Sequence, residues 1–186
     1  MANGEYDLIV IGAGSAGLTA AGFAAQLGLK VALAEKNRVG GDCTWTGCVP
    51  SKSLLKAAKI AHQMRNAHRF GIRSAEPEVD LKAVMARVKR VVDEVYQAQS
   101  PATLRASGID VYLGPTHFLD SHTIETGDDT LTGRRFLIAT GARPAVPPIS
   151  GIDDVDFLTY ETLWDLAELA RRLLVIGVGR SGCEMA

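Results

Sequence analysis

The chain lacks an excess of charge of either sign. Its 186 residues carry 20 Lys and Arg against 21 Asp and Glu, which gives a formal net charge of −1. No basic excess indicates nucleic-acid binding, and no block of like charges indicates a disordered tail. The composition is 47% hydrophobic and 22% charged. We therefore expect an ordinary globular protein, long enough for one buried domain and part of another.

Long hydrophobic runs and cysteines are also scarce. The N-terminal segment has no positively charged start and its apolar run is short, so we expect neither a secretory signal nor a membrane span. Three cysteines are too few for the disulfide framework of a secreted protein, and an odd number argues against full pairing. We expect a cytoplasmic protein, in which a close cysteine pair is more often catalytic or metal-binding than structural.

The N-terminus carries a strand–helix–strand pattern. The apolar run in YDLIVIGAGSAG ends in glycines, a helix of small residues is predicted over 18–28, and a second apolar run, KVALAE, begins at residue 30. A βαβ unit of about 30 residues predicts a parallel sheet in an α/β fold.

Two longer helices and three short strands are expected after this unit. We predict a helix over Ser51–Phe70 with Leu55, Ala58 and Ala61 on its buried face. A second helix over 80–99 would bury Val84, Val88, Val91 and Val95. The strands are predicted in IDVYLG, HTIET and RFLIAT, and the Pro- and Gly-rich segment 141–154 indicates a domain boundary.

The opening glycine pattern recurs near the C-terminus. Its glycines, at positions 12, 14 and 17, have the same spacing as Gly177, Gly179 and Gly182, which also follow an apolar run. The second copy stops four residues after its last glycine. A strand without neighbours can neither pair its backbone nor bury its side chains. We interpret the chain as the N-terminal fragment of a longer protein.

The first glycine turn has the context of a dinucleotide site. Its glycines permit a tight turn, close approach of the backbone to a pyrophosphate, and close packing of helix on strand. The helix N-terminus favours phosphate charge. Glu35, at the end of the second predicted strand, can accept hydrogen bonds from a ribose hydroxyl. An acid here favours an unphosphorylated ribose, hence FAD or NAD over NADP.

Cys43 and Cys48 lie in the segment GGDCTWTGCVPSKSLL. A regular helix would separate them by about 7.5 Å of rise, beyond the usual disulfide Cα limit of about 7 Å, so a disulfide needs a distorted turn. A thiolate at Cys48 would be favoured by a helix N-terminus and by Lys52. A metal clip needs more ligands, and His62 and His68 point in different directions on a helix. A redox pair is favoured, with a metal clip and two inert cysteines as alternatives.

The segment GGDCTWTGCVPSK resembles the redox-active signature of the FAD-dependent pyridine nucleotide–disulfide oxidoreductases, the family of glutathione reductase, dihydrolipoyl dehydrogenase and mercuric reductase. The other motifs agree in order and spacing: the first glycine turn with Glu35, the segment FLIATGARP, and the second glycine turn. The resemblance covers essentially the whole chain and is nearest to mercuric reductase-like members.

The resemblance implies roles for individual residues. Cys48 would be the thiol beside the flavin and Cys43 the thiol that exchanges with substrate, while Lys52 would lie near the flavin N5 and pair with Glu184. Thr140 and Gly141 would lie against the cofactor. The residues expected to bind FAD or the nicotinamide nucleotide are Gly12, Gly14, Ser15, Ala16, Gly17, Glu35, Lys36, Gly41, Asp42, Lys52, Gly114, Thr140, Gly141, Gly177, Gly179 and Gly182.

Some positions depart from the family pattern. Asp42 stands where many members have threonine near the pyrophosphate, and Trp45 and Thr46 replace the commoner residues between the cysteines. Cys183, in the second glycine turn, is interpreted as a small packing residue. No metal site is expected.

The fold implied is α/β. A Rossmann-like FAD-binding domain, with a parallel sheet, helices and a small antiparallel element, would occupy residues 1–150. Residues 151–170 would be a linker, and 171–186 would form the first strand and glycine turn of a truncated NAD(P)H-binding domain.

The activity implied is electron transfer from NAD(P)H through FAD to a Cys43–Cys48 disulfide, and then to a small-molecule, disulfide or metal-ion substrate. The full-length protein would be a homodimer without a nucleic-acid or membrane partner, and the fragment alone would be inactive. The alternative is a non-catalytic flavin- or nucleotide-binding module whose cysteines sense redox state or are inert.

Overall fold

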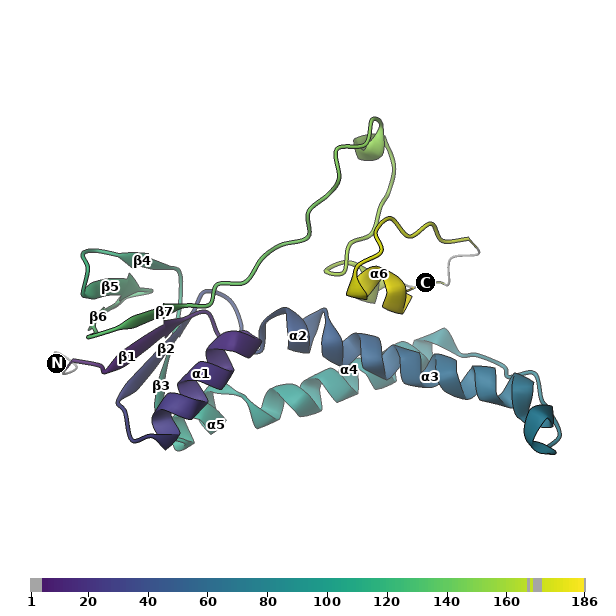
Figure 1. Cartoon of the computed structure of the whole chain (residues 1–186), viewed down its shortest axis with the longest axis horizontal. Helices are drawn as coiled ribbons and strands as arrows, with labels where there is room; N and C mark the ends of the chain where they lie inside the picture. Colours follow the sequence, from purple (N-terminus) through teal and green to yellow (C-terminus); the bar gives the residue numbers. More distant parts are fainter. Residues whose placement is uncertain (1–4, 167, 169–171, 186) are drawn as a thin grey trace. The chain divides into compact units, whose positions relative to one another are not determined.

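The computed structural model describes residues 5–166, 168 and 172–185. Strands and helices alternate at the N-terminus, and short strands follow the long helices (Figure 1). The elements in chain order are β1 (Leu8–Ile11), α1 (Ser15–Gln26), β2 (Val31–Glu35), α2 (Gly41–Trp45), α3 (Cys48–Asn66), the 3₁₀ helix η1 (Ala67–Phe70), α4 (Leu81–Ala98), α5 (Pro101–Ala106), β3 (Ile109–Leu113), β4 (Thr116–Phe118), β5 (Thr123–Thr126), β6 (Asp129–Thr132), β7 (Phe136–Ile138), the 3₁₀ helices η2 (Ile152–Asp154) and η3 (Leu163–Asp165), and α6 (Arg180–Met185).

The chain divides into two compact units. The first comprises Met1–Thr44 and Val95–Arg143, and the second comprises Trp45–Glu94 and Pro144–Ala186.

The first unit is built on a four-stranded parallel sheet with the order β3-β2-β1-β7. In this sheet Ile9 pairs with Ala32 of β2 and with Phe136 of β7. All five residues of β2 are buried, because a parallel strand in the middle of a sheet is covered on both faces. The predicted βαβ unit and the predicted strands at β3 and β7 are therefore confirmed.

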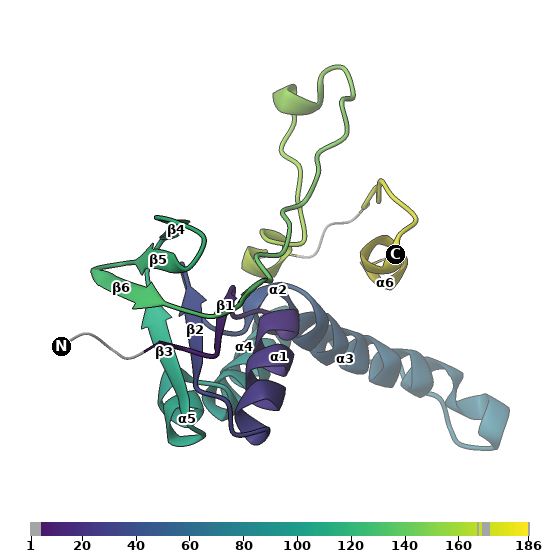
Figure 2. The same ribbon diagram turned by 60° about the vertical axis from the view of Figure 1, so that its left-hand side comes forward.

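The two faces of this sheet are covered by different layers (Figure 2). On one face, Val10 and Leu33 pack with Ala21 and Ala24 of α1. On the other, Ile9 and its neighbours on that face pack with Ile124 and Leu131 of the small sheet. Successive side chains of a strand point to opposite faces, so a single apolar run supplies both cores.

The small sheet is antiparallel, with the order β4-β5-β6. The predicted strand HTIET matches β5, whereas β4 and β6 were not predicted because each is short and mostly polar. Together the two sheets confirm an α/β, Rossmann-like fold with a small antiparallel element.

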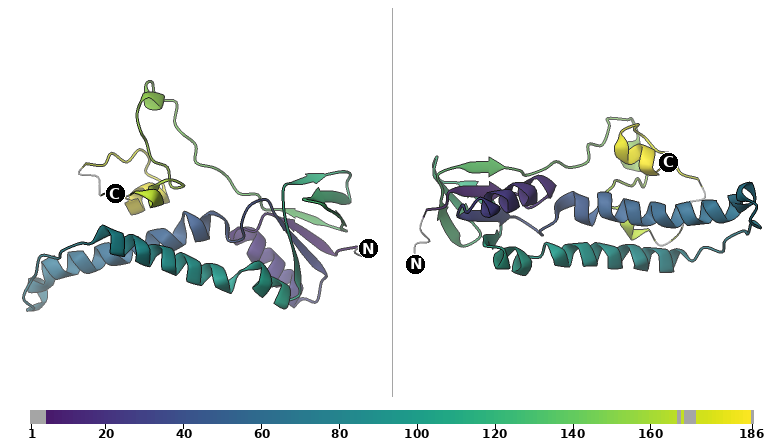
Figure 3. Two further views of the ribbon diagram at one scale, coloured as in Figure 1. Left: turned by 180° about the vertical axis from the view of Figure 1, so that it is seen from behind. Right: turned by 60° about the horizontal axis from the view of Figure 1, so that its bottom comes forward.

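The second unit contains α3 and most of α4, which run side by side in both views of Figure 3. Arg87 of α4 donates to the Ser53 hydroxyl of α3 at 2.8 Å. The predicted helix over Ser51–Phe70 is confirmed as α3 and η1, but its predicted buried face is wrong. Leu55 and Ala58 are exposed and Ala61 is only half-buried, while the buried residues of α3 lie at its N-terminal end. Leu54 and Ala57, each one residue before a predicted position, are half-buried instead.

The predicted stripe of α4 is correct in part. Val88 is buried, and Val84 and Val91 are half-buried. Val95 is 36% exposed, whereas Val92, which was not part of the predicted stripe, is buried. These exposures show that the buried face of α4 is turned by about one residue near its C-terminal end.

The second apolar run near the C-terminus does not form a strand over its described residues 172–178. A lone strand has no partner for its backbone groups, and residues 169–171, which belong to the predicted linker and strand, lie outside the described residues.

Among the helices that the structure describes, none is both long and apolar enough to cross a membrane.

Candidate functional site

The first glycine turn follows β1 and leads into α1. Gly12 has φ +102°, and a Cβ there would lie 2.3 Å from the carbonyl oxygen of Ala139 and 3.1 Å from the Cα of Thr140. Its N–H donates to Ala34 O at 2.8 Å. Only glycine tolerates both the positive φ and the close approach of the neighbouring backbone. Glycine at this position therefore allows the turn to pack between the ends of β2 and β7.

The other two glycines bring backbones together. A Cβ on Gly17 would lie 1.8 Å from Gly12 O, and a Cβ on Gly41 would lie 2.6 Å from the Cα of Gly14. Gly41, which has φ +57°, therefore lies against the turn. The resulting surface is made of backbone without side chains, as close approach of a pyrophosphate requires.

The N-terminus of α1 has no side-chain cap at Gly14. Ser15 and Ala16, the first two helical residues, are exposed. The first N–H groups of a helix have no intrahelical acceptor and favour an anion. The turn and this helix end together therefore have the chemistry of a phosphate site.

Glu35 at the end of β2 reaches the turn. Its Oε2 accepts from Ala13 N at 2.7 Å and its Oε1 accepts from Asn37 N at 2.9 Å. The residue is 9% exposed, so its carboxylate is held by backbone donors beside Gly12, where the sequence predicted the ribose contact. The next residue, Lys36, is exposed.

The remaining predicted cofactor residues of this unit lie at the ends of other segments. Thr140 and Gly141 follow β7 and are exposed, and Asp42 is exposed on α2. Gly114 follows β3, donates its N–H to Glu35 O at 2.8 Å, and approaches Gly127 so closely that a Cβ would lie 2.6 Å from the Gly127 Cα. This contact between loops accounts for glycine at position 114 without a ligand.

The two cysteines belong to different helices. Cys43 lies in α2 and Cys48 begins α3, with Thr46 and Gly47 between the helices, and both cysteines are half-buried. The chain between them is thus not one regular helix, which is the kind of distortion that a disulfide at this spacing needs. The pairing of the two sulfurs stays a prediction.

Lys52 and Glu184 form an ion pair within the second unit. The hydrogen bonds from Lys52 and Ser51, followed by the charges of Lys52 and Arg180, lower the pKa of Glu184. Ser51, which is buried, also donates to the Cys48 carbonyl oxygen at 3.2 Å. The two residues that the sequence predicted to pair are therefore brought together next to the Cys48 turn.

A small cavity of about 50 Å³ lies beside this pair. Its wall includes Cys48, Lys52 and Glu184 and also residues that were not predicted, among them Thr46, Tyr160, Trp164 and Arg180. Trp164 donates from Nε1 to Thr46 O and to Tyr160 O, both at 2.8 Å. A tryptophan 118 residues away from Thr46 has no local sequence signal that could have revealed this contact.

The second glycine turn has the local geometry of the first. Gly177 has φ +123°, a Cβ on Gly182 would lie 2.1 Å from Gly177 O, and Cys183 N donates to Gly179 O at 3.0 Å. The interpretation of Cys183 as a small packing residue is wrong: it is exposed, and its thiol donates to Val178 O at 3.5 Å. The short α6 buries none of its described residues.

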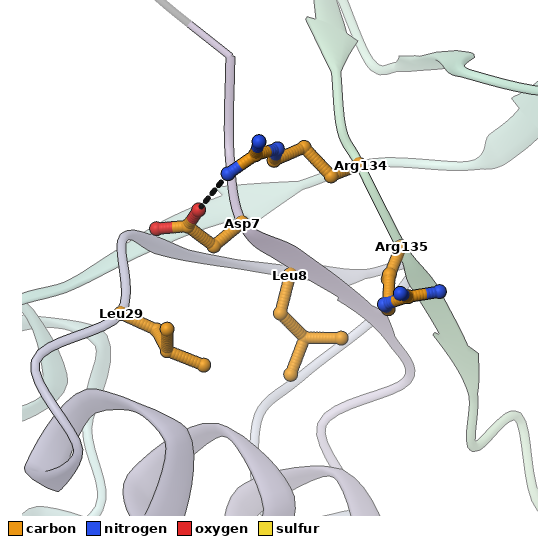
Figure 4. A pocket seen from close by; sticks show the side chains of 5 residues that line it. All are labelled: Asp7, Leu8, Leu29, Arg134 and Arg135. Carbon is orange, nitrogen blue, oxygen red and sulfur yellow. Dashed lines mark hydrogen bonds and ion pairs between the residues drawn. The ribbon is translucent and has the colours of Figure 1, made fainter.

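A second cavity, of about 610 Å³, is open at the amino-terminal end of β1 and β7 (Figure 4). It is lined by Asp7, Leu8, Leu29, Arg134 and Arg135. Asp7 pairs with Arg134 at 3.3 Å, and the hydrogen bond from Lys30 N, together with Arg134, lowers the pKa of Asp7. None of the predicted site residues lines this cavity, since the glycine turn lies at the other end of β1.

The first unit fits an adenine dinucleotide such as FAD on its own geometry. The backbone cradle of Gly14 and Gly41 would be filled by a Cβ, the N-terminus of α1 is uncapped, and a carboxylate stands at the end of β2.

Within the part of the chain that the structure describes, no three His, Cys, Asp or Glu side chains are grouped to hold a metal ion.

Comparison with known proteins agrees with this geometry. The family model described as pyridine nucleotide-disulphide oxidoreductase matches residues 6–186. A mercuric reductase of Lysinibacillus sphaericus is 38% identical over 97% of this chain and 33% of its own length. A mercuric reductase of Staphylococcus aureus is 38% identical over 98% of this chain and 34% of its own.

A dihydrolipoyl dehydrogenase of Bacillus subtilis (strain 168) is 35% identical over 98% of this chain and 41% of its own length. The chain thus spans about a third of the length of the mercuric reductases, and somewhat more of the dihydrolipoyl dehydrogenase.

Proposed function

The chain belongs to the pyridine nucleotide–disulphide oxidoreductases, and from this membership we propose that the full-length protein is an NAD(P)H-dependent flavoprotein that reduces its substrate through Cys43 and Cys48. The observation that carries the proposal is the first glycine turn, in which Glu35 accepts from Ala13 N beside the uncapped α1. This arrangement has the chemistry of an adenine dinucleotide site.

FAD, when bound, supplies the two-electron chemistry between a nicotinamide and a disulfide. The backbone of Gly12, Gly14 and Gly17 and the first turn of α1 would bind its pyrophosphate, and Glu35 would accept from its adenosine ribose. Ser15, Ala16, Lys36, Gly41, Asp42, Gly114, Thr140 and Gly141 complete the proposed cofactor set.

Cys48 is proposed as the thiol beside the flavin and Cys43 as the thiol that exchanges with substrate. Lys52 would lie near the reacting end of the cofactor, and its ion pair with Glu184 would fix its orientation. The positive end of α3, which begins at Cys48, and the Lys52 ammonium both favour a thiolate at Cys48.

The domain assignment is part of the proposal. Residues 1–150 would be the FAD-binding domain, 151–170 a linker, and 171–186 the start of an NAD(P)H-binding domain in which Gly177, Gly179 and Gly182 approach the nucleotide. The local likeness of the two glycine turns supports this reading.

The substrate class proposed is a disulfide or a mercuric ion. The names of the matched relatives, mercuric reductases and dihydrolipoyl dehydrogenases, support both. A homodimer is proposed for the full-length protein. A cytoplasmic location is proposed because the disulfide must be reduced back to the dithiol during turnover, and a reducing compartment favours the dithiol.

The test is a substrate panel on the purified full-length protein. NADH or NADPH oxidation is followed with mercuric ion, lipoamide and glutathione disulfide as acceptors. We expect one acceptor to be reduced by the wild type and by Cys183→Ser, and turnover to fall at least 100-fold in Cys43→Ser and Cys48→Ser. Flavin binding without turnover on any acceptor would favour a non-catalytic module.

A further inference from the structure

The open cavity of about 610 Å³ at the amino-terminal end of β1 combines apolar and charged side chains (Figure 4). Leu8 and Leu29 supply its apolar wall, and Asp7, Arg134 and Arg135 supply its charges. An apolar concave surface with a few polar groups is the usual form of a small-molecule site, for which about 300–1,000 Å³ is typical. The glycine turn proposed for FAD lies at the other end of β1, so the proposed cofactor does not account for this cavity.

The charges that line the cavity do not cancel. Arg134 Nη1 donates to Asp7 Oδ1 at 3.3 Å, and the hydrogen bond from Lys30 N, followed by that from Arg134, lowers the pKa of Asp7. Asp7 is therefore ionised at neutral pH and neutralises one arginine. The side chain of Arg135 has no hydrogen bond or ion pair with any residue that the structure describes. Two cations against one anion leave one positive charge at this cavity.

The neighbouring Lys30 does not change this balance. Its ammonium lies 4.6 Å from the centroid of the Tyr6 ring. Tyr6 belongs to the core on the face of the small sheet, whereas Leu8 packs against the core on the α1 face. The Lys30 charge is thus held by an aromatic ring on the other face of the sheet from the leucine wall.

The sheet fixes the backbone of both arginines. Arg134 N donates to Tyr6 O at 2.9 Å, and Arg135 O accepts from Ile9 N at 2.9 Å. A site on strands is held more precisely than a site on a loop. The uncompensated guanidinium of Arg135 is therefore presented from a fixed position beside the leucines.

The chemistry of these side chains selects a class of ligand. A guanidinium binds a carboxylate or a phosphate through two parallel N–H bonds. A monocarboxylate matches the one uncompensated charge, whereas a phosphate dianion would leave excess negative charge beside Asp7. The two leucines favour an apolar body on the same molecule.

We propose that this cavity binds a small amphipathic monocarboxylate, with its carboxylate on Arg135 and its aliphatic part against Leu8 and Leu29. The inference goes beyond the proposed function and does not depend on it, because the two sites use opposite ends of β1.

The test is equilibrium dialysis of the FAD-loaded full-length protein against radiolabelled hexanoate. We expect saturable binding of hexanoate, and competition at least about tenfold weaker from hexan-1-ol, acetate and inorganic phosphate, which lack the charge, the aliphatic part or the single charge on a tail. Arg135→Gln should lower hexanoate affinity about tenfold, because it removes hydrogen bonds between charged groups. Arg73→Gln, at an exposed arginine of the second unit, is the matched control and should bind as the wild type does.

Two further variants separate binding at the cavity from an effect on folding. Asp7→Asn keeps a side-chain oxygen that can accept from Lys30 N, the bond that Asp7 makes at 3.0 Å. It removes the only anion among the lining residues, so hexanoate affinity should rise severalfold. Leu29→Ser, at a leucine that is 41% exposed, should weaken the binding of hexanoate and leave competition by acetate unchanged.

An absence of saturable hexanoate binding, equal affinity in Arg135→Gln and the wild type, or no gain in Asp7→Asn would overturn the site. Tighter binding of phosphate than of hexanoate would overturn the proposed ligand class. Flavin content should be equal in all these variants, and none of these results bears on the proposed function.

Discussion

The two glycine turns have one local geometry and two different surroundings. In both, the first glycine has a positive φ, and a Cβ on the third would lie about 2 Å from the carbonyl oxygen of the first. Leu18 N donates to Gly14 O at 2.9 Å, and Cys183 N to Gly179 O at 3.0 Å. The spacing G-x-G-x-x-G is therefore sufficient for the turn and the start of a helix.

The surroundings show what the spacing does not supply. Gly12 lies against Ala139 and Gly14 against Gly41, whereas a Cβ placed on Gly177 or Gly179 has no described atom within 4 Å other than those of the glycine and its chain neighbours. The first turn is enclosed by the ends of β2 and β7 and by Gly40 and Gly41 at the start of α2. The second has no strand before it over residues 172–178. A backbone cradle for a dinucleotide thus comes from long-range partners, not from the glycine pattern.

The largest effect is expected from alanine at Gly12, the first glycine of the first turn, and a much smaller one from alanine at Gly177. Gly12→Ala places a Cβ 2.3 Å from the carbonyl oxygen of Ala139. This clash can be relieved only by displacing the end of β7. We expect the loss of FAD binding and of several kcal/mol of stability, a large part of the total for a typical domain. Gly177→Ala meets only the strain of a positive φ, about 1–2 kcal/mol, and should keep FAD binding.

The measurement for this pair is flavin content and thermal unfolding of the full-length variants. Equal losses in the two variants would show that the surroundings of the turns are alike and would break the comparison.

A smaller effect is expected at Glu35, for which the second turn has no described counterpart. Glu35→Ala removes the acceptor of Ala13 N and Asn37 N and the proposed ribose contact. Hydrogen bonds to a charged group contribute about 1.5–3 kcal/mol, so FAD affinity should fall about 10- to 100-fold. Quenching of flavin fluorescence measures it. Glu125→Gln, at a half-buried acid of β5 that pairs with His117, is the control. Unchanged affinity in Glu35→Ala would place the ribose elsewhere.

The smallest effect concerns the ion pair that ties α6 to α3. Because the pKa of Glu184 is lowered, mainly by the hydrogen bond from Lys52, the stabilisation is present above pH 4.5, the ordinary value for Glu. It is lost as the pH falls through the lowered pKa. Hydrogen exchange of the α6 amides, corrected for intrinsic rates, should therefore quicken on acidification in the wild type.

Glu184→Gln lacks the ion pair at every pH. Its α6 amides should exchange faster than the wild type near neutrality and show little dependence on pH, while Glu161→Gln, an exposed acid of the same unit, should behave as the wild type. A pH dependence that persists in Glu184→Gln would assign it to another group.

The sequence predicted the parts of this molecule that are set by local pattern. The βαβ unit, both glycine turns and Glu35 follow from spacing, and the Lys52–Glu184 pair followed from the resemblance to a family. The sequence did not predict that Cys183 and Leu55 of α3 are exposed, because burial depends on what packs against a helix. Trp164 and its contact with Thr46 depend on a fold that joins residues far apart in the chain, and β4 and β6 are too short and polar to carry a pattern.

The central claim is that Cys48 works beside a flavin bound at the first turn. We would reduce the FAD-loaded full-length protein anaerobically with two electron equivalents and record its visible spectrum. A long-wavelength charge-transfer band is expected in the wild type and in Cys183→Ser, whose thiol lies in the second turn, and no such band in Cys48→Ser. A wild-type protein that binds and reduces FAD without the band, or a band that persists in Cys48→Ser, would contradict the assignment.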